Sequence, residues 1–201
     1  MIEVISPFPI EELPRVWLWF QQAGASLLTD QGPQTMDEFV DDWAVRGARC
    51  VTWGVYRDGD LGGWIVYEPV TPTTGNAHCV FRKGTGRGNS FWGWKTTIPA
   101  ITAALDDLFS VGVLRVGLLI QEESRAIESL VLHLGAIKEA LWYSVRGDDG
   151  KPLTKDGAVI RFLQYGLYRE QWYERNKTVD AGAVVSDSPD TGDRGLSQSA
   201  A

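Results

Sequence analysis

The pattern of apolar and polar positions predicts closely spaced strands and helices from residue 2 to residue 174. Apolar runs of strand length predict strands at residues 2–5, 50–56, 62–68, 77–81, 114–120, 137–145 and 159–167. Apolar positions at helical spacing predict helices at residues 10–23, 35–45, 99–109, 123–134 and about 168–174. Hairpins in the middle and at the end, with helical crossovers between them, predict a mixed α/β (α+β) sheet covered by helices.

The segments between these elements contain turn signals. Asp58–Gly59 predicts a tight hairpin turn. Residues 69–76 are predicted to be a turn-rich link, and residues 146–156 a polar loop between the last two strands. The nearly continuous apolar run at residues 114–120 predicts a strand buried on both faces.

Composition changes after residue 175. Residues 176–201 contain no aromatic side chain and are rich in Ser, Asp, Gly and Ala. Such a segment buries too little apolar surface to offset the entropy of ordering. We therefore expect one domain over residues 1–175, followed by a disordered acidic tail over residues 176–201.

Charge and cysteine content limit the functional classes. The 201-residue chain has a formal net charge of −7, which argues against a dedicated nucleic-acid binder. Cys50 and Cys79 are expected to be buried, inert thiols, and the two Cys and two His lack metal-ligand spacing, so no metal is expected. We see neither a signal peptide nor an apolar run near the ~20 residues that span a bilayer, and we expect a soluble, cytoplasmic protein in a reducing compartment.

A glycine-rich turn follows the strand that ends at Phe81. Its sequence is Arg82, Lys83, Gly84, Thr85, Gly86, Arg87 and Gly88. The glycines allow backbone N–H groups to approach a ligand closely, and the three cationic side chains supply positive charge in an acidic chain. A solvated loop is the alternative interpretation, because a glycine-rich run is a weak signal alone.

A second pattern lies forty residues further on. Ser124 follows the predicted strand at residues 114–120, and the next helix ends in Leu132, His133, Leu134, Gly135 and Ala136.

With the element order, these two patterns resemble the GNAT superfamily of acyl-CoA-dependent N-acyltransferases over about residues 1–173. In that family a Gln/Arg-x-x-Gly-x-Gly/Ala turn after the fourth strand binds the CoA pyrophosphate, and Lys83–Gly88 matches it with Lys in first place. The resemblance implies a mostly antiparallel twisted sheet whose parallel fourth and fifth strands splay apart. It also implies acetyl-CoA as co-substrate, an amine acceptor, and cofactor contacts from the residues of the turn, Phe81 and Ser124.

The chain departs from the family at three places. Ser124 stands where Asn is usual, and Val131 stands where many members carry a Tyr that protonates the leaving thiolate. Residues 89–97 separate the turn from the predicted helix. These departures favour a second hypothesis, a GNAT-like protein that has lost catalysis and serves as a structural or interaction module. The tryptophan-rich composition also resembles GNAT-like bacteriophage proteins, so a virion assembly or a homo-oligomer is a further expectation.

Three side chains are candidates for the base that would deprotonate an amine. His78 lies on the fourth predicted strand and titrates near neutrality, although a hydrogen-bonded structural role fits it equally well. Glu68 ends the third strand and could act through a water molecule, and Glu122 follows the fifth strand. For both carboxylates an exposed position at the end of a strand is the alternative.

Overall fold

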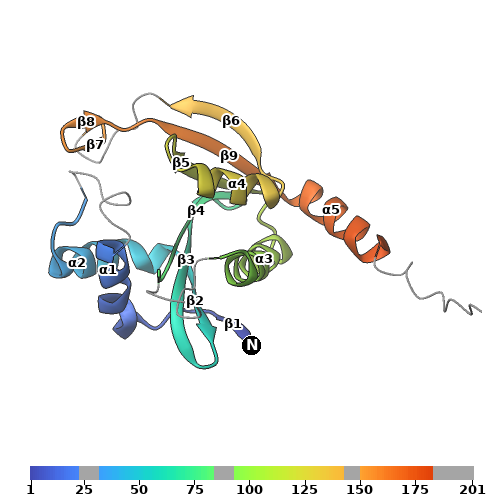
Figure 1. The fold of residues 1–201 in the computed structure, drawn as a ribbon, viewed down its shortest axis with the longest axis horizontal. Helices are drawn as coiled ribbons and strands as arrows, with labels where there is room; N and C mark the ends of the chain where they lie inside the picture. The colour runs from blue at the N-terminus through green and yellow to red at the C-terminus, as the bar shows by residue number, and fades with distance from the viewer. Residues whose placement is uncertain (23–31, 84–92, 143–149, 183–201) are drawn as a thin grey trace, which may run out of the picture.

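The computed structural model describes residues 1–22, 32–83, 93–142 and 150–182 (Figure 1). A seven-stranded sheet, in the order β1-β2-β3-β4-β5-β9-β6, forms its centre, and a small hairpin, β7-β8, stands apart. The strands are β1 Ile2–Ile5, β2 Val51–Arg57, β3 Asp60–Thr71, β4 Thr74–Phe81, β5 Arg115–Gln121, β6 Ile137–Trp142, β7 Thr154–Lys155, β8 Ala158–Val159 and β9 Phe162–Tyr168. The helices are η1 Ile10–Glu12, α1 Leu13–Gln22, α2 Met36–Arg46, η2 Gly47–Arg49, α3 Trp94–Ser110, α4 Arg125–His133 and α5 Arg169–Gly182.

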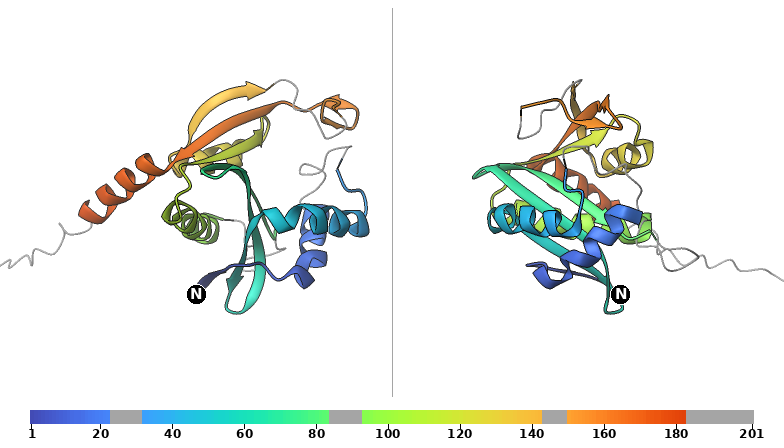
Figure 2. Two further views of the ribbon diagram at one scale, coloured as in Figure 1. Left: turned by 180° about the vertical axis from the view of Figure 1, so that it is seen from behind. Right: turned by 90° about the vertical axis from the view of Figure 1, so that its left-hand side faces the viewer.

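Strands β4 and β5 form the parallel pair of a sheet whose other neighbouring strands are antiparallel. Their pairing covers three positions, from Thr74 opposite Arg115 to Asn76 opposite Gly117. Beyond these positions the two strands diverge, so that β1–β4 and β5-β9-β6 form two halves of the sheet that open away from each other (Figures 1 and 2). The predicted fold class, including the splayed fourth and fifth strands, is confirmed.

Helices cover the sheet on two faces, and the alternation of side chains along β3 explains both cores. Trp64 and Val66 point into a core shared with α1 and α2, which we call the α1/α2 face. Ile65 and Tyr67 point into a larger core shared with α3, α4 and β9, which we call the α3/α4 face. Since β3 is buried on both sides over seven consecutive residues, it holds the two layers together.

Helix α2 shows how local sequence fixes an element near the sheet. The Thr35 side chain accepts a hydrogen bond from the Glu38 N–H at 3.2 Å, and the Glu38 carboxylate accepts one from the Thr35 N–H at 3.2 Å. This reciprocal capping box satisfies two backbone donors that the first turn leaves free. The helix predicted at residues 35–45 is therefore confirmed within a residue at each end.

Two predicted segments around prolines are wrong. The link expected at residues 69–76 is mostly strand, because β3 runs to Thr71 and β4 begins at Thr74. Pro69 is tolerated there because the register with β4 shifts between Pro69 and Thr71, where a missing N–H costs little. Helix α3 begins at Trp94, so Pro99 lies inside the helix and not in its first turn. Residues 94–97 of the expected gap therefore belong to this helix, and residues 89–92 lie outside the described residues.

The C-terminal part also differs from expectation. The strand predicted at residues 159–167 divides into β8 and β9. Helix α5 continues to Gly182, past the expected domain boundary at residue 175. No proline or glycine interrupts the sequence before Gly182, so backbone hydrogen bonding can continue although the apolar stripe has ended. Residues 183–201 of the expected tail lie outside the described residues.

Candidate functional site

The free edge of β4, residues 77–81, is the central feature of the candidate site. β5 leaves this edge after Asn76, so in the described chain no strand pairs with β4 there on the β5 side. Backbone N–H and C=O groups on such an edge can bind an extended ligand, as they would bind a further strand. His78 and Cys79 on this edge are exposed, whereas Val80 and Phe81 are buried.

His78 and Cys79 lie on opposite faces of the sheet. Val80 belongs to the core of the α1/α2 face and Phe81 to that of the α3/α4 face. Alternation therefore directs His78 towards the α1/α2 face and Cys79 towards the α3/α4 face. The expectation of two buried cysteines is wrong for Cys79, which is exposed because β5 has diverged from β4 there, and Cys50 is only partly buried. Protein still surrounds this thiol closely enough that desolvation raises its pKa to about 12.

The surroundings of His78 favour a neutral imidazole. His78 pairs in register with Val66, and Glu68 follows two residues later on the same face of β3. Desolvation lowers the pKa of His78, Glu68 opposes this shift, and Arg46 at the end of α2 adds to it. A neutral imidazole that solvent can reach is able to accept a proton.

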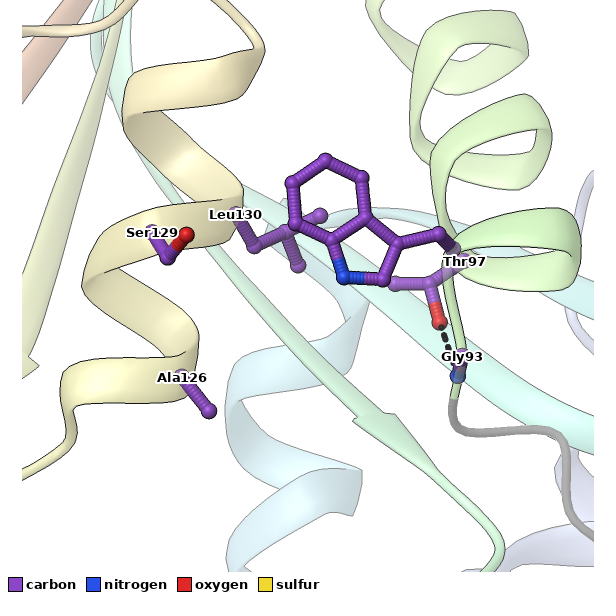
Figure 3. A pocket seen from close by; sticks show the side chains of 6 residues that line it. Gly93, Thr97, Ala126, Ser129 and Leu130 are labelled. Carbon is purple, nitrogen blue, oxygen red and sulfur yellow. Dashed lines mark hydrogen bonds between the residues drawn. The ribbon is translucent and has the colours of Figure 1, made fainter.

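A cavity lies between the first turn of α3 and helix α4 (Figure 3). Its volume is about 130 Å³, and it is lined by Gly93, Trp94, Thr97, Ala126, Ser129 and Leu130. The Thr97 hydroxyl accepts a hydrogen bond from the Gly93 N–H at 3.2 Å. Ala126, Ser129 and Leu130 recur on one face of α4, because residues three and four apart share a helix face.

The N-terminus of α3 lies at this cavity. Its N-cap residue, Gly93, has a φ of 154° and makes no side-chain cap. The N–H groups of Thr96 and Thr97 bond to the Gly93 carbonyl at 3.0 and 2.8 Å. Within the described residues, those of Trp94 and Lys95 have no partner. Free N–H groups at the positive end of a 17-residue helix favour anions, phosphate groups among them.

The structure describes only part of the predicted turn. Gly84, Thr85, Gly86, Arg87 and Gly88 lie outside the described residues.

The flanking residues of the turn are described. Phe81 is 3% exposed and packs in the core, so a cofactor contact from it would come from its backbone. Arg82 donates to Asp60 at 2.6 Å, a pairing between strand ends that the sequence did not suggest. Lys83 is exposed.

The remaining predicted residues lie around β5 and α4. Ser124 precedes α4, and its hydroxyl caps no helix donor. Glu122 forms an ion pair with Arg161 at 2.8 Å, which engages its carboxylate at the end of β5. Val131 is 5% exposed within the α3/α4 core.

Two further observations concern classes of ligand. Among the residues that the structure describes, no three His, Cys, Asp or Glu side chains are grouped so that they could hold a metal ion. Over the same residues, no helix has the length and apolar character needed to cross a membrane.

Comparison with known proteins gives similarity of structure without similarity of sequence. No protein-family model and no curated protein matches the chain. RimJ of Mycobacterium smegmatis, solved with CoA-disulfide, has a TM-score of 0.68 and 16% identity over 90% of this chain and 89% of RimJ. YncA, described as an acetyltransferase of Salmonella typhimurium and solved with acetyl-CoA, has a TM-score of 0.62 and 12% identity over 84% and 94%. A ribosomal-protein-alanine N-acetyltransferase of Escherichia coli has a TM-score of 0.60 and 14% identity over 84% and 94%.

These similarities establish that the chain has the GNAT fold. None of the three structures comes from a bacteriophage, so the expected kinship with phage proteins finds no support in them.

Proposed function

We propose that this protein transfers an acetyl group from acetyl-CoA to a primary amine of a small molecule or a protein. The observation that carries the proposal is the divergence of β4 and β5 after three paired positions, which leaves the edge of β4 free beside two helices. The similar structures are acetyltransferases, and two of them hold CoA-disulfide or acetyl-CoA, which supports the same class of reaction here.

The cofactor would bind along the free edge of β4. Its pantetheine arm has the extended shape and amide groups that suit an unpaired strand edge. Its phosphates would lie at the N–H groups of Trp94 and Lys95, and we expect residues 83–88 to contribute further phosphate contacts. The exposed side chains of Lys83 and Lys95 would add positive charge there, and Ser124, whose hydroxyl caps no helix donor, follows β5 on the other side.

Acetyl-CoA supplies a thioester whose carbonyl carbon bonds to the amine nitrogen as the carbon–sulfur bond breaks and the thiolate leaves. His78 is the proposed base that takes the proton from the amine, because it is accessible and its pKa is lowered. Glu68 is the alternative base, which would take the proton from the amine through a water molecule. If His78 is the base, Glu68 would help to hold the imidazole in place. Glu122 is a weaker candidate, since Arg161 already engages its carboxylate.

The acceptor would approach on the α1/α2 face, where His78 points. The acetyl donor would lie across the sheet, towards the α3/α4 face. An acidic chain with a net charge of −7 favours a cationic acceptor by long-range attraction. A primary amine that is protonated in solution fits this requirement.

Calorimetric titration with acetyl-CoA, followed by an acetylation screen over polyamines and peptides, tests the proposal. We expect micromolar binding of acetyl-CoA and turnover of at least one amine, both reduced when Lys83 and Lys95 are changed to Glu. Failure to bind at millimolar acetyl-CoA would exclude the proposed activity.

The second candidate function is a GNAT-like structural or interaction protein without catalysis, including a component of a virion. The buried, apolar Val131 favours it, because this residue cannot protonate the leaving thiolate. CoA binding without turnover of any amine, together with purification in a stable assembly or homo-oligomer, would support this second function instead.

A further inference from the structure

Trp94 is an unusually exposed aromatic residue for a position beside a cavity. It is the first residue of α3, and its side chain is 52% exposed. It also lines the cavity between α3 and α4. The energetic benefit of a tryptophan comes from burial, so half of this side chain's apolar area is still available to a ligand.

His133 completes an aromatic corner with Trp94. The two rings lie 4.5 Å apart between centroids, at an interplanar angle of 69°. In such an edge-to-face pair the ring that presents its edge keeps both faces open, and the other ring keeps one face open, so either arrangement leaves Trp94 a face for a ligand. Since His133 is the last residue of α4, the pair links the two helices on either side of the cavity.

The other cavity walls suit a flat heterocycle. Ala126 and Leu130 supply apolar surface, and Ser129 supplies an exposed hydroxyl that can meet a ring nitrogen or an amino group (Figure 3). In the described part of the chain, none of the lining side chains is charged.

We propose that Trp94, braced by His133, is the stacking platform for the adenine ring of CoA. This inference rests on the proposed function, which places the phosphates at the N-terminus of α3. The pantetheine arm leaves the phosphates towards β4, so the nucleoside leaves them on the other side. The half-exposed Trp94 in the helix layer, outside the gap between the strands, is therefore on the adenine side.

Calorimetric titration of Trp94→Ala with three probes, CoA, adenosine 3′,5′-bisphosphate and pantetheine, tests the inference. Loss of base–aromatic stacking should lower the affinity for CoA and for the bisphosphate by about 10- to 100-fold and leave the affinity for pantetheine unchanged. Trp94→Phe should recover most of the affinity, because it retains a ring face. Trp142→Ala, at a similarly exposed tryptophan of β6 away from the cavity, should bind all three probes as the unsubstituted protein does.

The outcomes separate this inference from the proposed function. If the unsubstituted protein does not bind CoA, both are overturned. If the unsubstituted protein binds CoA, two results would overturn only the stacking inference. Either Trp94→Ala binds CoA equally well, or its affinity for pantetheine falls by the same factor as its affinity for CoA. If Trp94→Ala has a lower Tm than the unsubstituted protein, the measurement is repeated with Trp94→Leu, which keeps the apolar bulk but has no π face.

Discussion

His78 and Cys79 are adjacent in sequence, yet their side chains lie on opposite faces of the sheet. Alternation along β4 directs one towards the proposed acceptor and the other towards the proposed cofactor. Both side chains are exposed, yet surrounding protein atoms desolvate them enough to shift the pKa of each. Their titration behaviour can therefore be used to examine the two sides separately.

His78→Gln should lower kcat by about 10²- to 10⁴-fold, the usual contribution of a general base, with little change in the KM for acetyl-CoA. Because desolvation lowers the pKa of His78 below its ordinary value of 6.5, the acid limb of kcat/KM should have its midpoint below pH 6.5. The limb should disappear in the variant, and added imidazole should restore part of the rate. An acid limb that persists in His78→Gln would assign the base to another group.

The same lowered pKa affects stability. Between pH 6.5 and the lower folded-state pKa, the unfolded chain binds a proton at His78 that the folded chain does not. The free energy of unfolding should therefore fall as the pH is lowered through this window, and less so in His78→Gln. Denaturant titrations at pH 7.5 and pH 5.5 provide the measurement.

Cys79 should react slowly with iodoacetamide despite its exposure. With a pKa of about 12, only about one thiol in ten thousand is ionised at pH 8, and the thiolate is the reactive form. In a Cys50→Ser background we expect labelling about 100-fold slower than that of glutathione, and slower still with CoA present. In Cys79→Ser the remaining Cys50, on the other face, should show no effect of CoA. Rapid labelling of Cys79 that CoA leaves unchanged would remove it from the cofactor side.

Among the elements, the α2 cap and the base of the parallel pair make distinct contributions to stability. Thr35→Ala should cost about 1 kcal/mol, because it removes the acceptor for the Glu38 N–H. For a domain of this size that lowers Tm by about 2–4 °C. Thr35→Ser keeps the hydroxyl and should retain most of the stability; an equal loss in both variants would mean that the hydroxyl does not cap the helix.

Gly75→Ala tests the base of the parallel pair. A Cβ at this position would lie 2.6 Å from Cζ of Tyr67 and even closer to the backbone carbonyl of Glu68, which cannot rotate away. Overpacking of this kind should cost about 1–3 kcal/mol in denaturant unfolding. Val70→Ala, at a side chain 68% exposed on the adjoining strand, should change the free energy of unfolding by much less. Equal effects of the two substitutions would contradict the close packing at Gly75.

The sequence predicted these elements where periodicity and turn residues agree, as at Thr35 and at Asp58–Gly59. It failed at Pro69, which β3 accommodates because Pro69 lies beyond the last residue paired with β2 and next to a register shift against β4. Alternation along the strand assigns His78 and Val80 to one face, but the register that pairs His78 with Val66 is needed to place Glu68 on the same face. By contrast, the ion pairs of Arg82 with Asp60 and of Glu122 with Arg161 join residues distant in sequence, so no local pattern could reveal them.

At the scale of the whole molecule, cofactor binding should stabilise the fold. At 100 times its Kd, CoA adds about 2.7 kcal/mol to the free energy of unfolding, or about 5–11 °C in Tm. Raising the salt concentration should reduce the shift, since the proposed phosphate contacts involve the exposed Lys83 and Lys95. The charge reversals Lys83→Glu and Lys95→Glu should reduce it as well. If pantetheine alone gives the full shift, the phosphates do not bind where we propose.

The separation of β4 from β5 also has a kinetic consequence. The unpaired edge of β4 carries His78 on one face of the sheet and Cys79 on the other, so donor and acceptor can arrive from opposite directions and neither has to leave before the other binds. Initial-rate measurements should then give intersecting double-reciprocal lines, the pattern of a ternary complex. A single molecule that joins CoA to the amine through a short linker would occupy both sides at once, and it should inhibit competitively against each substrate.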